Sequence, residues 1–138
     1  MTTYALNGLG RIGKLALRPL LEQGAKVAFI NDAVGDPAMH AHLLEFDSVH
    51  GRWPAAFEAD ERSISIDSTR IPVTSTRNLE DLTLDGVDVV IDCTGAFKTE
   101  VKLAPYFVAG VKKVVVSAPV KDGPTANIVY GVNDDIYD

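Results

Sequence analysis

The order of apolar and polar residues predicts alternating strands and helices at the start of the chain. The apolar run at residues 4–6 indicates a short strand, which leads directly into a loop with three closely spaced glycines. From Ile12 the apolar residues recur with helical spacing, so we expect a helix that ends near Gly24. Residues 26–30 form a second expected strand, which ends at Asn31-Asp32.

The middle of the chain changes from one kind of pattern to another. Asp36 followed by Pro37 is typical of a helix start, because aspartate caps a helix N-terminus and proline fits the first helical position. We expect this helix to reach about Leu44. Residues 55–76 instead separate single apolar residues by polar and turn residues, which predicts short antiparallel strands.

The last part of the chain returns to strands alternating with helices. Four of the six residues at 87–92 are β-branched, as expected for a strand buried on both faces. We then expect a helix from 99 to 110, a buried strand at 113–116 and a final strand at 127–132. This order predicts an α/β fold, Rossmann-like and doubly wound, with a mainly parallel sheet and a small antiparallel insertion. The length fits one domain, residues 1–138.

Composition narrows the class of protein further. Of the 138 residues, 46% are hydrophobic and 23% are charged, as in soluble globular proteins. The formal net charge of −6 argues against a nucleic-acid partner, which needs clustered Lys and Arg. The single cysteine, Cys93, excludes an internal disulfide. The N-terminus lacks a secretory signal and no apolar run approaches the roughly 20 residues that span a bilayer, so we expect a cytoplasmic protein without a membrane partner.

The glycine loop "LNGLGRIGK" is the strongest candidate for a binding element. Gly8 can make a tight turn, Gly10 lets a diphosphate approach the backbone, and Gly13 lets helix and strand pack closely. The helix N-terminus then offers free N–H groups, and Arg11 adds a positive charge. A plain glycine turn is the alternative interpretation of the same residues.

Polar residues at the ends of the predicted strands extend this candidate site. Asp32 could accept hydrogen bonds from adenosine ribose hydroxyls and would repel a 2′-phosphate, which favours NAD over NADP. Thr94 and Ser117 follow two later strands and could hydrogen-bond ribose or nicotinamide. Ordinary turn residues would produce the same pattern at these two positions.

Several short segments together resemble the phosphorylating glyceraldehyde-3-phosphate dehydrogenases. In chain order, the matching segments are residues 7–13, 31–32, 46–51, 93–97, 109–114, 117–119 and 130–133. The resemblance covers nearly the whole chain and implies the NAD-binding half of a longer two-domain enzyme. Leu9 replaces the aromatic residue usual in the family, and the small Ala33 beside the acid could allow some tolerance of NADP.

The resemblance also implies where the cofactor NAD would lie. It places the diphosphate along Asn7, Gly8, Gly10, Arg11 and Ile12, and the adenosine ribose on Asp32. It places adenine near Arg77, and the nicotinamide half along Thr94, Gly95, Phe97, Ser117 and Ala118.

The family oxidises an aldehyde through a cysteine thioester, with hydride transfer to NAD and attack by phosphate. The catalytic cysteine and histidine of the family have no counterpart among these residues, so we expect no catalytic residue here and an inactive, excised or truncated cofactor domain. Cys93 ends a predicted buried strand and is not expected to be the nucleophile. His40 and His42 would lie on different faces of a helix, and with His50 they lack a nearby cysteine, so no metal site is expected.

Some alternatives remain open on the sequence alone. Residues 42–53, 117–122 and 127–130 most resemble a subgroup that accompanies an arsenical exporter and uses arsenate in place of phosphate. A related enzyme such as an erythrose-4-phosphate dehydrogenase would share the same half, and a non-catalytic NAD-sensing module is a third possibility. The small-molecule substrate would be a sugar-phosphate aldehyde, and the full-length protein is expected to be a homo-oligomer.

Overall fold

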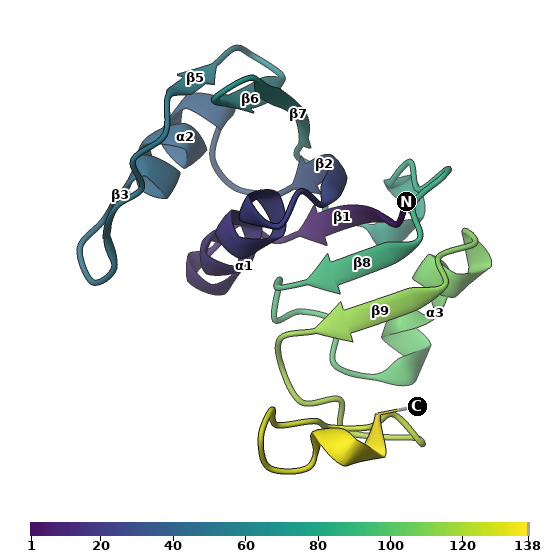
Figure 1. Ribbon diagram of the computed structural model, residues 1–138. Coiled ribbons are helices and arrows are strands. Elements are labelled where there is room, and N and C mark those ends of the chain that lie inside the picture. The colour runs from purple at the N-terminus through teal and green to yellow at the C-terminus, as the bar shows by residue number, and fades with distance from the viewer. Residues whose placement is uncertain (138) are drawn as a thin grey trace.

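The computed structural model describes residues 1–137, so Asp138, the last residue of the predicted domain, lies outside the described part. Helices alternate with strands along most of the chain (Figure 1). The helices are α1 (Arg11–Glu22), α2 (Pro37–Glu45) and α3 (Glu100–Val108), with the 3₁₀ turns η1 (Leu79–Asp81) and η2 (Asp134–Ile136). The strands are β1 (Thr3–Asn7), β2 (Lys26–Asn31), β3 (Phe46–Asp47), β4 (Gly51–Arg52), β5 (Phe57–Ala59), β6 (Ser63–Ile66), β7 (Thr69–Thr74), β8 (Val89–Asp92) and β9 (Lys113–Val116).

A mainly parallel sheet forms the centre of the molecule, as the sequence predicts. Its strand order is β5-β6-β7-β2-β1-β8-β9, and every pair from β7 to β9 is parallel. Figure 1 shows β1, β8 and β9 side by side, pointing the same way. The carboxyl ends of these strands therefore meet at one edge of the sheet, where α/β folds bind ligands.

Helices cover both faces of this sheet. Successive residues of a strand point to opposite faces, and neighbouring residues of β1 accordingly enter separate hydrophobic cores. Leu6 packs in the core that includes Leu17 of α1 and Leu44 of α2. Ala5 packs in the core that includes Leu103 of α3. The doubly wound arrangement is thus confirmed.

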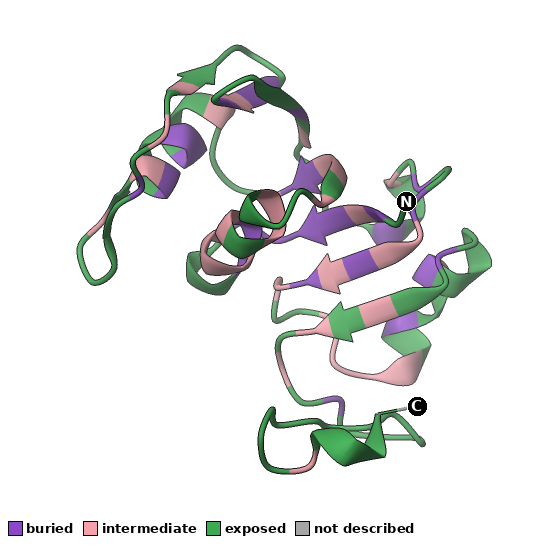
Figure 2. Cartoon of the chain, viewed as in Figure 1, coloured by how far each residue is buried: buried purple, intermediate pink, exposed green. Residues whose placement is uncertain are grey.

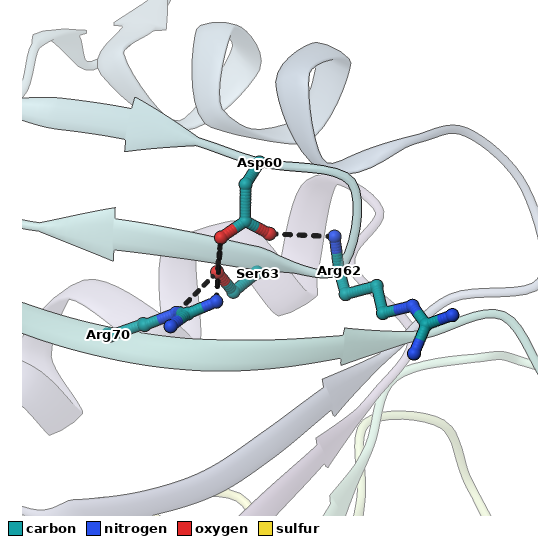
Figure 3. A network of polar contacts seen from close by, with 4 residues as sticks. All are labelled: Asp60, Arg62, Ser63 and Arg70. Carbon is teal, nitrogen blue, oxygen red and sulfur yellow. Dashed lines mark hydrogen bonds and ion pairs between the residues drawn. The ribbon is translucent and has the colours of Figure 1, made fainter.

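The antiparallel insertion is also confirmed, since β5 pairs with β6 and β6 with β7. The turn between β5 and β6 is held by the Asp60 carboxylate (Figure 3). It accepts 2.8 Å from the Arg62 backbone N–H, 2.7 Å from the Ser63 hydroxyl and 2.7 Å from the Arg70 guanidinium. Arg70 lies on β7, so this network joins all three strands. The sequence did not reveal the separate two-stranded sheet of β3 and β4.

The predicted helix boundaries agree closely with the structure because the capping residues act as expected. Asp36 caps α2 by accepting a 2.8 Å hydrogen bond from the Met39 N–H. Thr99 caps α3 in the same way. Gly24 adopts a φ of +74°, which suits the residue after the end of α1.

The prediction of a strand at 127–132 is wrong, since residues 127–129 have no regular structure and residues 130–132 form a turn. Local side-chain hydrogen bonds replace strand pairing there: Asn133 Oδ1 accepts 2.6 Å from the Val129 N–H, and Asp134 Oδ1 accepts 2.8 Å from the Gly131 N–H. Asn and Asp side chains commonly compete with regular structure in this way. Most of the segment is exposed (Figure 2), and Tyr130 is 92% exposed.

Two other predicted strands need correction in detail. The strand at 113–116 forms, but it is not buried, because it lies at the edge of the described sheet and Lys113 and Val115 are exposed. The strand expected at 87–92 begins only at Val89. Its side chains alternate between half-buried and buried, with Val90 and Asp92 buried.

Candidate functional site

A cavity of about 320 Å³ lies where the glycine loop meets the carboxyl ends of β1, β2 and β8. Most of the predicted site residues line it: Asn7, Gly8, Gly10, Asp32, Arg77, Thr94 and Phe97. Residues that are far apart in the sequence thus come together at the sheet edge that the parallel topology indicates. Asn31, Ala33, Val34 and Thr76 also line the cavity, although the sequence did not single them out as site residues.

The remaining predicted residues lie outside the lining of this cavity. Arg11 and Ile12 are exposed in the first turn of α1, and Gly95 is exposed in the loop after β8. Ser117 and Ala118 follow β9, where the Ser117 N–H donates 2.9 Å to the Asp92 carbonyl. These five follow the glycine loop, β8 and β9 along the chain, and none of them lines the cavity itself.

Each of the three loop positions favours glycine for a different structural reason. Gly8 has a φ of +93°, and a Cβ there would lie 2.7 Å from the Thr94 backbone nitrogen. A Cβ on Gly13 would lie 2.0 Å from the Gly8 carbonyl oxygen, so this position permits the close contact between helix and turn. Gly10 differs, because a Cβ there would meet no atom within 4 Å. Gly10 lines the cavity, and its missing side chain leaves the space open.

The Asp32 carboxylate is fixed by the loops on either side of it. Its Oδ2 accepts 2.7 Å from the Leu9 N–H in the glycine loop, and its Oδ1 accepts 2.8 Å from the Val34 N–H. An ionised carboxylate has about four acceptor positions. Two of them are used here, so Asp32 can still accept two hydrogen bonds from a ligand in the cavity.

A buried polar network supports the strand ends beneath the cavity. Asn31 Oδ1 accepts 2.7 Å from the Thr74 hydroxyl, and Asn31 Nδ2 donates 2.8 Å to Asn7 Oδ1. Asn7 Nδ2 in turn donates 2.7 Å to the Tyr106 hydroxyl. Because Asn7 and Asn31 are buried, these bonds satisfy groups that water cannot reach, and they hold β7, β2 and β1 in register at the site.

The network continues to Asp92, whose role the sequence analysis missed. The Tyr106 hydroxyl donates 2.7 Å to Asp92 Oδ2. Asp92 Oδ1 accepts 3.0 Å from the Thr94 N–H and 2.7 Å from the Thr94 hydroxyl. Burial, together with the nearby Asp92 charge, raises the pKa of Tyr106 far above its ordinary value, so the hydroxyl stays a donor. The available signals were a carboxylate ending an apolar strand and Tyr106 three residues after Leu103 on one helix face.

Cys93 also lines the cavity, but its environment disfavours the thiolate. Burial raises the pKa of the Cys93 thiol, and the neighbouring Asp92 adds to this, while a hydrogen bond with Ser117 opposes it. A nucleophilic cysteine needs the opposite shift. Chemistry through Cys93 therefore gains no support from its surroundings.

Within residues 1–137, no group of three or more His, Cys, Asp or Glu side chains is arranged to hold a metal ion. His40 is buried and bonded, with Nε2 2.9 Å from the Val34 carbonyl, and His50 lies 3.4 Å from Asp47. His42 packs against Phe46. Across that same part of the chain, none of the helices has the length and apolar character needed to cross a membrane.

The residues of the cavity fit a dinucleotide on structural grounds. The open space beside Gly10 adjoins the N-terminus of α1, where backbone N–H groups lack partners within the helix and attract phosphate. The free acceptor positions of Asp32 suit the two hydroxyls of a ribose. Both features open into one cavity.

Comparisons with known proteins agree with this reading. Residues 2–100 match the family model described as "Glyceraldehyde 3-phosphate dehydrogenase, NAD binding domain". The chain is 43% identical over 136 residues to glyceraldehyde-3-phosphate dehydrogenase 3 of Nostoc sp., covering 96% of this chain and 40% of that protein. It is 46% identical over 132 residues to glyceraldehyde-3-phosphate dehydrogenase of Cereibacter sphaeroides, covering 94% and 39%.

A third relative is also more than twice as long as the chain. The chain is 44% identical over 138 residues to glyceraldehyde-3-phosphate dehydrogenase of Pseudomonas aeruginosa, covering 96% of this chain and 41% of the relative. The chain thus spans about two fifths of the length of these curated relatives. The family model names NAD as the cofactor, in agreement with the choice of NAD from the sequence. The chain belongs to the glyceraldehyde 3-phosphate dehydrogenase family and corresponds to the NAD-binding domain of that family.

Proposed function

We propose that NAD binds in the cavity between the glycine loop and Asp32. The observation that carries this proposal is the Asp32 carboxylate, which two backbone N–H groups fix beside the glycine turn while two acceptor positions stay free. The ribose of the adenosine half would donate its hydroxyls to those positions. A 2′-phosphate in the same place would meet the Asp32 charge, so NADP would bind less well.

The other residues would divide the cofactor among them. The diphosphate would lie along Asn7, Gly8, Gly10, Arg11 and Ile12, where the turn and the N-terminus of α1 provide N–H donors. Adenine would lie by Arg77, which lines the cavity and is exposed. The nicotinamide half would lie along Thr94, Gly95, Phe97, Ser117 and Ala118. Asn7 also belongs to the buried network, which explains why an amide at this place can stay rigid.

We further propose that the whole protein is a phosphorylating aldehyde dehydrogenase that acts on a sugar-phosphate aldehyde. The names of the relatives support this proposal. In such a reaction NAD supplies the hydride acceptor. A cysteine outside these residues would carry the acyl group, and phosphate or arsenate would release it. The residues described here would bind and orient the cofactor, with no catalytic group of their own.

Several broader properties belong to the same proposal. Residues 1–138 would act as one cofactor-binding domain, the protein would be cytoplasmic, and the full-length form would be a homo-oligomer. If the enzyme uses arsenate, it would contribute to arsenate resistance. The resemblance of residues 42–53 to the subgroup that accompanies an arsenical exporter favours this role. The test of arsenate use is to compare phosphate and arsenate as acyl acceptors in the full-length enzyme.

Calorimetry with the 138-residue chain tests the binding proposal. We expect heat of binding with NAD, and a weaker affinity for NADP. No heat with either nucleotide, from a chain that unfolds cooperatively and is therefore folded, would overturn the proposal.

A further inference from the structure

A closed ring of hydrogen bonds lies behind the Asp32 carboxylate. Asp32 accepts from the Leu9 N–H, the Leu9 carbonyl accepts from Lys14 Nζ, and Lys14 Nζ lies 3.3 Å from His40 Nδ1. His40 Nε2 lies 2.9 Å from the Val34 carbonyl, and the Val34 N–H donates back to Asp32. The ring thus connects the glycine loop, α1, α2 and the loop after β2.

The partners of His40 determine which of its nitrogens carries the proton. A carbonyl oxygen can only accept, so His40 Nε2 must be the donor toward Val34. Lys14 can only donate, so Nδ1 must present its lone pair. These two requirements together describe the neutral Nε2–H imidazole. His40 is 3% exposed, so water cannot easily replace either partner.

Protonation of His40 is incompatible with this ring. A proton on Nδ1 would face the Lys14 ammonium, which sets donor against donor and cation against cation at 3.3 Å. The first turn of α2 begins just before His40, and a helix N-terminus also disfavours a cation. The acidic groups around the pair are Asp32, whose charge acts on Lys14, and Asp36, whose carboxylate caps α2.

The pKa of Lys14 also indicates that a second positive charge at this place is unfavourable. Burial lowers the pKa of the Lys14 ammonium, and the Asp32 carboxylate opposes that shift. A second cation placed against Lys14 would therefore add to an unfavourable burial. The simplest response is for Lys14 to leave His40, which opens the ring at the point that joins α1 to α2.

We propose that Lys14 and His40 are positioning residues for the Asp32 carboxylate, and that protonation of His40 opens the ring and weakens NAD binding. This inference rests on the proposed binding of NAD at Asp32. It adds a proton-linked control of that site, since nucleotide and proton would compete through the ring.

Three variants separate this role from a general effect on the fold. His40→Gln keeps both a donor and an acceptor but does not titrate. His40→Leu keeps much of the volume and removes both hydrogen bonds. His42→Gln is the matched control, because His42 lies on the same helix but packs against the Phe46 ring. Thermal unfolding of each variant checks that it is folded.

Calorimetry with NAD at about pH 8 and about pH 5.5 is the first measurement. For the wild-type chain and His42→Gln we expect NAD to bind more weakly at the lower pH, because protonation of His40 and binding of NAD oppose each other. His40→Gln should bind as the wild type does at the higher pH and lose the dependence. A folded His40→Leu should bind more weakly at both. Equal pH dependence in wild type and His40→Gln would overturn the proposal.

NMR of the free chain is the second measurement, and it does not depend on NAD. We expect the amide resonances of Leu9 and Val34 to shift with the titration of His40, and to stay unchanged in His40→Gln. If neither amide follows His40, the ring does not have the proposed role. If both follow but NAD gives no heat at either pH, the ring is confirmed while the proposed function and its affinity coupling are rejected.

Discussion

The Tyr106 hydroxyl on α3 donates a 2.7 Å hydrogen bond to the carboxylate of Asp92 at the end of β8, and both side chains are fully buried. The same hydroxyl accepts from Asn7, so one atom ties α3 to the ends of two neighbouring strands. A buried carboxylate needs such donors, since losing them would leave a charge without compensation. The cavity floor thus depends on a helix that does not itself line the cavity.

Replacing Tyr106 with phenylalanine should destabilise the fold. The change removes the donor to Asp92 and the acceptor of Asn7 while keeping the ring in place. We expect a loss of roughly 1.5–3 kcal/mol in the free energy of unfolding, the range for hydrogen bonds to charged groups. Urea unfolding measures it. Tyr130→Phe is the matched control, since Tyr130 is 92% exposed, and it should leave stability unchanged. Equal stability of the two variants would contradict this role of Tyr106.

Two glycines of the loop have different roles: Gly13 permits close packing, and Gly10 leaves space for the ligand. An alanine at Gly13 would press against the Gly8 carbonyl oxygen, and we expect a loss of roughly 1–3 kcal/mol, as for overpacked sites. An alanine at Gly10 meets no atom of the chain. Gly10→Ala should lose at most about 1 kcal/mol, the scale of a helix N-cap, yet bind NAD at least about tenfold more weakly.

Unfolding and calorimetry on the same two glycine variants test this separation. The two variants act as controls for each other, because each adds one methyl group to the same loop. Unaltered NAD affinity in Gly10→Ala would show that the diphosphate does not pass this residue. Unaltered stability in Gly13→Ala would show that helix and turn do not pack as described.

Replacing Asp32 with alanine should weaken NAD binding and reduce the preference over NADP. The ribose would lose hydrogen bonds to a charged acceptor, worth roughly 1.5–3 kcal/mol, or about 10-fold to 150-fold in affinity. NADP should lose less, because its repulsion by the carboxylate disappears as well. Calorimetry with both nucleotides gives the ratio of the NAD affinity to the NADP affinity. An unchanged ratio would mean that Asp32 does not select between them.

The β5-β6-β7 insertion should lose stability in acid. The Arg62 backbone N–H, the Ser63 hydroxyl and the Arg70 charge hold the pKa of Asp60 below its ordinary value of 3.8. A lowered folded pKa contributes stability that is present above the unfolded value and disappears as pH falls through the folded one. We therefore expect Asp60→Asn to be less acid-sensitive than wild type between about pH 5 and pH 2. The urea midpoint measured across this pH range tests the prediction. Asp85 is exposed, so Asp85→Asn is the control, and its midpoint should depend on pH as that of the wild type does.

The elements with strong local signals could be predicted from the sequence, and so could the edge of the sheet where the site lies. Capping by Asp36 and Thr99 determined helix starts, and the loop glycines and Asp32 indicated the cavity. The strand expected at 127–132 failed because Asn133 and Asp134 bond locally, which an apolar pattern does not reveal.

Features that depend on distant partners could not be predicted. The Tyr106 contact with Asn7 and the Lys14 contact with His40 join residues from different elements. No periodicity within one element specifies such a pair. The exposure of Val115 has the same origin, since an apolar strand at the edge of a sheet has the same local pattern as one at its centre.

The most direct test of the central claim is a crystal structure of the chain with NAD. We expect the adenosine ribose hydroxyls within hydrogen-bonding distance of the Asp32 carboxylate, and the diphosphate against Gly10 and the N-terminus of α1. A nucleotide bound elsewhere, or a ribose turned away from Asp32 in a fully occupied cavity, would contradict the claim.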